Sequence, residues 1–129
     1  MQEKADNSNG RPLIFHISSR EQIKELRDQI LRLHGFEVES MVYSDKVVDE
    51  VVKKDYGLVL IDVENNARVQ NAQELCDSIR KIQPELAVAF VCNHQVSIQS
   101  DCPDDIIHAT FDPQALVRGV TEALSQRPG

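Results

Sequence analysis

Short apolar runs alternate with amphipathic segments along most of the chain. Continuous apolar runs of this length are typical of strands that are covered on both faces. Five such strands are predicted, at residues 13–17, 36–42, 58–61, 86–92 and 106–111. The segments between them carry apolar residues at helical spacing, as in Ile23, Leu26, Ile30 and Leu33, which favours amphipathic helices. The stretch at 94–104 has no such pattern.

This alternation predicts an α/β fold. Strands that alternate with helices are joined by right-handed crossovers, so they form a parallel sheet with helices on both faces. Capping boxes at 19–22 and 71–74 predict two helix starts, and Asp112 followed by Pro113 predicts a third. Gly35 stands where a helix would end in a left-handed conformation.

Length and composition are those of one domain. The chain has 129 residues, which suits a single domain of roughly 100–150 residues. Residues 12–125 are predicted to form it, with 1–11 as a disordered lead-in and 126–129 as a tail.

The 14 basic and 21 acidic residues give a net charge of −7, which argues against direct nucleic-acid binding. No run approaches the ~18 apolar residues of a membrane span. The N-terminus has no signal-peptide features, so we expect a cytoplasmic protein without membrane contact.

The cysteines suggest no special chemistry. Cys76, Cys92 and Cys102 are odd in number and include no Cys-x-x-Cys pair, so neither a disulfide framework nor a redox motif is predicted. Cys76 lies on an apolar helical face and is expected to be a core residue. A metal site formed by Cys92, His94 and Cys102 with Asp62 is disfavoured, because the spacing matches none of the closed zinc patterns.

Chemistry is expected at the carboxyl ends of the strands, where doubly wound sheets bind their ligands. The residues predicted to lie there are Ser18, Ser19, Asp62, Cys92, Asn93 and Asp112. His16 lies within the first strand, where we expect a neutral, hydrogen-bonded histidine, with pH sensing as an alternative. No glycine-rich phosphate loop follows this strand and no Ser-His-Asp arrangement converges on the strand ends, so no enzyme is predicted.

Two segments carry a family resemblance, IFHISSREQIKEL at 14–26 and DYGLVLIDV at 55–63. With separations of 44 residues from Ser18 to Asp62 and 30 from Asp62 to Cys92, the chain resembles the response-regulator receiver (CheY-like) domains of two-component signalling. The resemblance covers about residues 12–125. It implies a flavodoxin-like, doubly wound sheet of five parallel strands in three αβα layers. The fourth helix is expected to be shortened or irregular, because 94–104 has no helical face and contains Pro103.

The resemblance also assigns roles at the strand ends, with Asp62 as the phosphoacceptor. Receivers carry two acids after the first strand, which bind Mg²⁺ with the acceptor. They also carry a Ser or Thr after the fourth strand and a Lys-Pro pair after the fifth. Here the corresponding residues are Ser18, Ser19, Cys92, Asp112 and Pro113, and Ala109 takes the place of the switch aromatic. Neutral serines weaken a magnesium site, and an aspartate in place of the lysine repels a phosphoryl group.

The sequence therefore predicts a pseudo-receiver that is degenerate for phosphorylation. The resemblance implies action through protein contact with a histidine kinase, an output domain or a second copy of the chain, across about residues 94–124. Val96, Ile98, Ala109 and Val117 are the candidate contact residues. No cofactor or metal is expected.

Two other functions stay open at this stage. A conventional receiver would be phosphorylated on Asp62 by a histidine kinase with Mg²⁺. A small-ligand or redox sensor would use the strand ends around Cys92 and His16, with an enclosed cavity and a reactive thiol. The sequence leaves the cis or trans state of the Asp112–Pro113 bond open as well.

Overall fold

Five parallel strands form a single sheet in the order β2-β1-β3-β4-β5. The structure is a computed structural model that describes residues 12–93, 95–99, 101–109 and 112–125. The strands are β1 (Leu13–Ser18), β2 (Glu37–Val42), β3 (Tyr56–Val63), β4 (Ala87–Cys92) and β5 (Asp105–His108). The strand order reverses between β1 and β3, which is the switch point of a flavodoxin-like sheet. The predicted five-stranded, doubly wound parallel sheet is confirmed.

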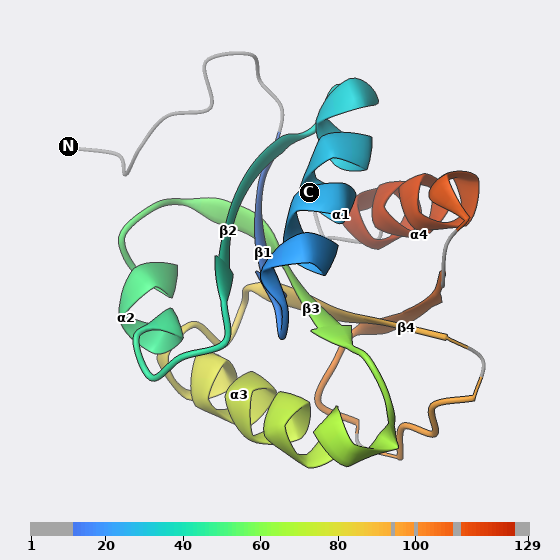
Figure 1. Ribbon diagram of the computed structural model, residues 1–129. Coiled ribbons are helices and arrows are strands. Elements are labelled where there is room, and N and C mark those ends of the chain that lie inside the picture. Colours follow the sequence, from blue (N-terminus) through green and yellow to red (C-terminus); the bar gives the residue numbers. More distant parts are fainter. Residues whose placement is uncertain (1–11, 94, 100, 110–111, 126–129) are drawn as a thin grey trace, which may run out of the picture.

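Helices cover both faces of the sheet, which gives three layers (Figure 1). The helices are α1 (Glu21–Leu33), α2 (Val47–Val51), the 3-10 turn η1 (Asn66–Arg68), α3 (Val69–Ile82) and α4 (Pro113–Ser125). Helices α1 and α4 lie on one face and contact each other, while α2 and α3 lie on the other. No helix among the described residues is long and apolar enough to cross a membrane.

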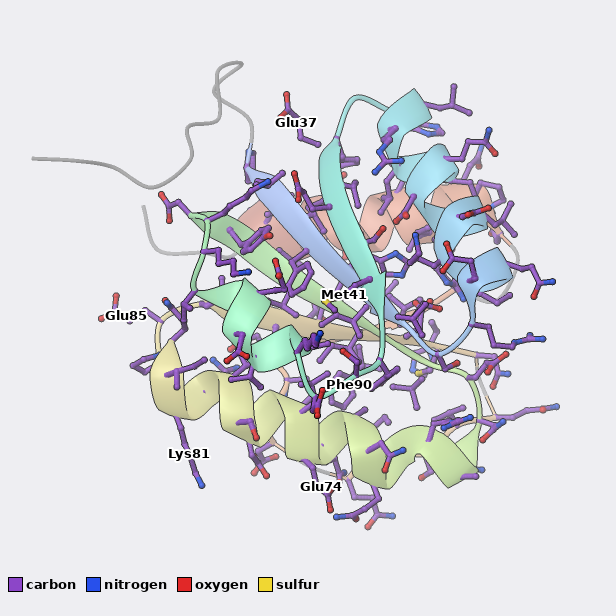
Figure 2. The ribbon with its side chains drawn as sticks, turned by 60° about the vertical axis from the view of Figure 1, so that its left-hand side comes forward. Glu37, Met41, Glu74, Lys81, Glu85 and Phe90 are labelled. Carbon is purple, nitrogen blue, oxygen red and sulfur yellow. A yellow bond between two sulfur atoms is a disulfide. The ribbon has the colours of Figure 1, made fainter. Side chains whose placement is uncertain are left out.

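Alternate residues of the central strands supply two apolar clusters, one on each face. Ile17, Ile61 and Phe90 pack beneath α2 and α3, whereas Leu60 and Val91 pack beneath α1 and α4. All five are buried. Figure 2 shows Met41 and Phe90 turned toward the interior, while Glu74, Lys81 and Glu85 project outward. A sheet with apolar side chains on both faces requires the continuous apolar runs that the sequence contains.

The two predicted capping boxes do not form. The Ser19 hydroxyl donates to the Glu64 carboxylate at 2.8 Å instead of capping α1, because an ionised oxygen is the stronger acceptor. Helix α3 begins at Val69, before the predicted box at 71–74, since η1 runs directly into it. The cap lies further upstream, where Asn65 Oδ1 accepts from the Ala67 amide at 3.0 Å.

Two other helix signals are confirmed. Gly35 follows α1 with φ of 92°, the left-handed conformation expected at a helix end. Asp112 Oδ1 accepts from the Gln114 amide at 3.0 Å and so caps α4. The Asp112–Pro113 bond is trans, since the described residues contain no cis peptide bond. Strand β5 was expected to reach Phe111 but ends at His108, and 110–111 lie outside the described residues.

The connection between β4 and β5 contains no helix in its described residues, 93, 95–99 and 101–104. This agrees with the expected irregularity of the fourth helix. A disulfide between Cys76 of α3 and Cys102 joins the connection to the helix, with Cα atoms 6.2 Å apart. The expectation of no disulfide was therefore wrong. The two cysteines are 26 residues apart, and they meet only because the connection lies across α3. The predicted lead-in at 1–11 and tail at 126–129 lie outside the described residues.

Candidate functional site

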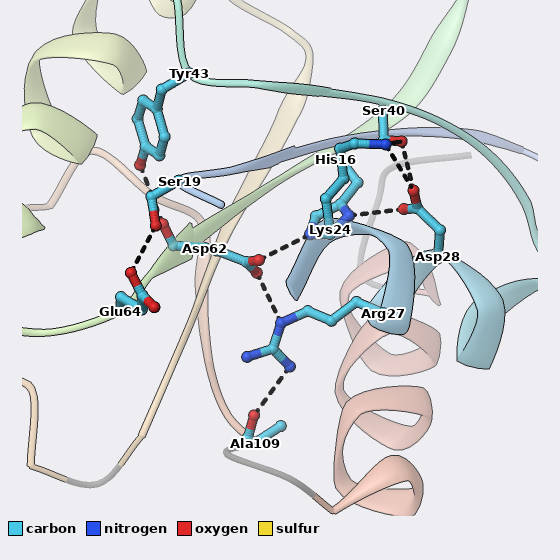
Figure 3. A network of polar contacts seen from close by, with 10 residues as sticks. All are labelled: His16, Ser19, Lys24, Arg27, Asp28, Ser40, Tyr43, Asp62, Glu64 and Ala109. Carbon is cyan, nitrogen blue, oxygen red and sulfur yellow. Dashed lines mark hydrogen bonds and ion pairs between the residues drawn. The ribbon is translucent and has the colours of Figure 1, made fainter. Parts of the chain in front are cut away.

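Asp62 lies near the end of β3 with 2 % of its surface exposed. Its two carboxylate oxygens face different cations (Figure 3). Oδ2 is 3.1 Å from Nε2 of His16, and Oδ1 is 3.1 Å from Nε of Arg27. The backbone oxygen of Asp62 accepts from the Tyr43 hydroxyl at 3.1 Å. Both oxygens of the expected phosphoacceptor are therefore paired with side chains of the same chain.

His16 connects Asp62 to a second buried carboxylate. The imidazole is fully buried in β1, and its Nδ1 lies 2.8 Å from Oδ1 of Asp28. Burial by itself lowers the pKa of His16, but attraction by Asp62 and hydrogen bonds to both aspartates outweigh it. The pKa rises to about 9. His16 is therefore protonated at neutral pH and donates from both ring nitrogens. The expected hydrogen bonding is confirmed, whereas the expected neutral state was wrong.

Asp28 is held on the far side of His16 by residues of α1 and β2. The Ser40 hydroxyl donates to Oδ2 of Asp28, and Lys24 Nζ lies 3.7 Å from the same oxygen. Burial opposes ionisation of Asp28, but the hydrogen bonds from His16 and Ser40 outweigh it and lower its pKa. The pKa of Asp62 is likewise lowered: burial opposes its ionisation, and the charge of His16 is the main force that overcomes it. Asp28 and Asp62, with His16 between them, thus form one buried ionic network.

Arg27 extends this network to β5. Besides approaching Asp62, its guanidinium donates from Nη1 to the Ala109 carbonyl at 3.2 Å. The side chain is 14 % exposed. Its Nε lies at ion-pair distance from Asp62 Oδ1, although no hydrogen bond of ordinary geometry joins those two atoms. One side chain of α1 therefore ties the end of β3 to the end of β5.

The expected pocket residues are only partly brought together. A cavity of about 220 Å³ at the strand ends includes Asp62, Cys92 and Asn93 in its lining, together with Arg20 and Arg27. Asp112 and Pro113 line a separate cavity of about 120 Å³ between α1 and α4. Asp112 therefore serves as a helix cap and does not face Asp62 across the first cavity.

The two serines after β1 point to different surroundings. Ser18 is fully buried beside Asp62, and its hydroxyl helps to lower the Asp62 pKa, although no hydrogen bond of ordinary geometry joins the two side chains. Ser19 donates to Glu64, which is paired with Arg20. The carboxylate of Glu64 is thereby also engaged by neighbouring groups of the chain.

Cys92 is the one cysteine outside the disulfide among the described residues, and it is buried. Burial raises the pKa of its thiol. Its sulfur lies 3.8 Å from Nδ1 of His108. The metal cluster considered from the sequence loses Cys102 to the disulfide, and His94 lies outside the described residues. Across the part of the chain that the structure describes, no three His, Cys, Asp or Glu side chains gather as metal ligands.

The expected contact residues differ in exposure. Val96 and Ala109 are buried, so they are unavailable to a partner in this conformation and the expectation for them was wrong. Val96 belongs to the apolar cluster beneath α3, and Ala109 to the cluster beneath α4. Ile98 and Val117 are half-buried and keep some surface.

Sequence reasoning missed Arg27 and Asp28, which supply the partners of Asp62 and His16. The available signal was a pair of charged residues on the same face of α1 as Ile23 and Leu31. Charged side chains on the buried face of a helix require partners, so such a pair indicates an internal ionic network.

Comparisons with known proteins identify the fold. No family model matches the chain, and neither does any curated protein. Among solved structures, the chain superposes on NtrX from Brucella abortus with TM-score 0.73 and 21 % identity, covering 91 % of this chain and 28 % of NtrX. The superposition on CheY4 of Vibrio cholerae has a TM-score of 0.72 at 14 % identity and covers 88 % of this chain and 98 % of CheY4. The superposition on TrrA from Thermotoga maritima, in complex with Mg²⁺-BeF, has a TM-score of 0.72 at 19 % identity and covers 87 % of this chain and 98 % of TrrA. This chain therefore has the CheY-like fold of response-regulator receiver domains.

Proposed function

We propose that this chain is a receiver-like signalling module of a two-component pathway, and that it acts through protein contact without phosphorylation of Asp62. The observation that carries the proposal is the pairing of Asp62 with His16 and Arg27. These two cations already neutralise the carboxylate that would have to act as the nucleophile.

Phosphoryl transfer to an aspartate needs a free carboxylate oxygen and cations placed on the incoming phosphoryl group. Both oxygens of Asp62 lie 3.1 Å from a nitrogen of the protein, and the residue is 2 % exposed. An attack by Asp62 would have to displace His16 or Arg27 from its partner. Removing one member of a buried ion pair costs about 3–5 kcal/mol.

The rest of the pocket points in the same direction. Ser18 and Ser19 offer neutral hydroxyls where receivers carry the acids that bind Mg²⁺, and Ser19 is already engaged by Glu64. Asp112, which the resemblance aligns with the receiver lysine, caps α4 and lines a separate cavity, so it offers no cation to this pocket. None of these three residues supplies a cation for a phosphoryl group, and the two arginines that line the cavity are already paired, Arg20 with Glu64 and Arg27 with Asp62.

A module of this kind would be controlled by its partner or its abundance, because a ligand shifts an equilibrium only if it binds the two conformations differently. Arg27 joins Asp62 to the Ala109 carbonyl, which fixes the end of β5 relative to β3. A histidine kinase, an output domain or a second copy of the chain would then bind a preformed surface. We place that surface across about residues 94–124, with Ile98 and Val117 as contacts.

The competing function is a conventional phosphoacceptor, and a phosphorylation assay separates the two. The full chain would be incubated with acetyl phosphate and Mg²⁺ beside a conventional receiver domain, and both analysed by intact mass spectrometry. The proposal predicts a phosphoryl adduct on the comparison domain and none on this chain. An adduct on the wild-type chain that is absent from Asp62→Asn would overturn it.

The sensor alternative is weakened by the state of Cys92. Cys92 lines the cavity of about 220 Å³ at the strand ends. The burial that raises the pKa of the Cys92 thiol, however, keeps it in its protonated, unreactive form at neutral pH.

A further inference from the structure

The Cys76–Cys102 disulfide holds a segment that has no helix of its own. It joins α3 to the described part of the β4–β5 connection. Val96 and Ile98 of this connection pack in the same apolar cluster as Cys76. The covalent bond therefore helps to keep apolar side chains of the connection against the core.

Polar contacts place the end of the connection independently of the disulfide. Arg80 of α3 donates to the Cys102 carbonyl from Nε at 3.1 Å and from Nη2 at 2.6 Å. Its Nη2 also lies 2.7 Å from Oδ2 of Asp104, and Asp104 accepts from the Val88 amide at 2.9 Å. With these contacts intact, Cys102 would stay near Cys76 after the S–S bond is broken, so the bond could form again.

Asn66 makes polar contacts to the middle of the connection, beside the packing of Val96 and Ile98. Asn66 donates from Nδ2 to the Gln95 carbonyl at 3.3 Å and accepts from the Ser97 amide at 3.0 Å. Both are neutral hydrogen bonds at exposed residues, each of which contributes roughly 0.5–1.5 kcal/mol net. Among the described residues of the connection, 95–99 are therefore the ones that we expect to loosen once the disulfide is open.

The two cysteines of the disulfide differ in exposure. Cys76 is fully buried, whereas Cys102 is partly exposed. Exchange begins with a thiolate that approaches one sulfur of the disulfide, so access selects Cys102.

We propose that the Cys76–Cys102 disulfide is a thiol–disulfide exchange site that takes a dithiol as its reductant, and that its reduction loosens residues 95–99 of the β4–β5 connection while Arg80 keeps the backbone of Cys102 beside α3. A thiolate of the dithiol attacks Sγ of Cys102, and the Cys76 sulfur leaves with the bonding electrons and takes up a proton. The second thiolate of the dithiol then attacks the mixed disulfide and releases Cys102. Two electrons and two protons reach the protein, and the reductant leaves as its own disulfide.

Loosening of residues 95–99 changes the molecular surface. Val96 and Ile98 would no longer be held over the cluster that contains Phe90 and Cys92. Reduction would thus uncover apolar surface next to β4, within the region proposed above for partner binding. The exchange site itself does not depend on that proposed function.

Thiol counting on the native chain tests the exchange. Protein isolated without reductant, with thiols blocked during lysis, should show one free cysteine after denaturation, Cys92. Brief treatment with dithiothreitol under native conditions should raise the count to three. It should also increase hydrogen exchange in residues 95–99 while leaving β1 and β3 protected. Three free thiols before reduction would overturn the proposal, as would a reduction rate no faster than global unfolding.

A trapping experiment tests which sulfur is attacked. A dithiol reductase whose resolving cysteine is replaced by serine should form a mixed disulfide with Cys102, identified by peptide mapping; a bond to Cys76 would contradict the mechanism. A matched pair in the Cys92→Ser background gives a second measurement. Iodoacetamide should alkylate Cys102 in the Cys76→Ser variant at least about tenfold faster than Cys76 in the Cys102→Ser variant. Equal rates would contradict the assigned asymmetry.

Discussion

The protonated state of His16 makes stability depend on pH in a defined direction. The imidazole is fully buried between Asp28 and Asp62, and its pKa rises from 6.5 to about 9 on folding. Below pH 6.5 both the folded and unfolded chains hold the proton, so the full stabilisation is present. Between 6.5 and about 9 the unfolded chain has lost the proton while the folded chain keeps it. Unfolding then becomes easier as pH rises.

The expected magnitude follows from the same values. Each pH unit across this range lowers the free energy of unfolding by up to about 1.4 kcal/mol. The change from pH 6.5 to 9 therefore amounts to about 3 kcal/mol. Asp28 and Asp62 act at the other end of the scale, because their pKa values are lowered from 3.8. Their contribution is present above pH 3.8 and is lost as pH falls through the lower folded values. Stability should therefore be greatest between about pH 4 and 6.5.

Urea denaturation at several pH values between 6 and 9 measures this dependence. The wild-type chain should lose about 3 kcal/mol across the range, and His16→Gln should lose most of this slope. His34→Gln, which removes a histidine outside the network, should keep it. An NMR titration of the His16 ring in the wild-type chain supplies a direct reading if His16→Gln does not fold. A flat wild-type profile, or a ring that titrates near 6.5, would refute the account of the network.

Three further perturbations follow from the packing and the charges. Asp62→Ala should lower the free energy of unfolding by about 3–5 kcal/mol in urea, because it removes the carboxylate shared by Arg27 and the buried His16 and leaves His16 with Asp28 alone. Reduction of the Cys76–Cys102 disulfide should lower the free energy of unfolding by about 3–4 kcal/mol, as expected when the cysteines are 26 residues apart in the chain. Gly119→Ala should lower the free energy of unfolding by about 1–2 kcal/mol, although alanine has the higher helix propensity, because the new Cβ would lie 2.4 Å from Cγ2 of Ile107. In the Gly119→Ala background, Ile107→Ala should lower the free energy of unfolding by less than it does in the wild-type chain. Equal losses in the two backgrounds would contradict this contact.

The fold was predictable because its signals are local. The apolar runs and the helical spacing between them determine the strands and helices, and a parallel sheet brings the strand ends to one edge. Asp62 and Cys92 were placed correctly by that reasoning. Capping was less predictable, since the Ser19 hydroxyl donates to the carboxylate of Glu64, just after β3, and not to its own helix.

The partners of Asp62 could not be read from the sequence, because they depend on how α1 packs across β1. His16 and Asp62 are 46 residues apart in the chain, and Asp28 reaches His16 from a different element. The disulfide depends similarly on the path of the connection over α3. Neither cysteine carries a sequence motif that would indicate it.

The most direct test of the central claim is an NMR titration of the backbone amides with Mg²⁺ and then with beryllofluoride, which mimics an aspartyl phosphate. Because His16 and Arg27 already occupy the carboxylate of Asp62, no site-specific shifts are expected up to millimolar concentrations of both. Asp62→Asn serves as the control. Shifts around Asp62 and Ala109 that vanish in this variant would mean that the carboxylate is free to form the adduct, and would contradict the account.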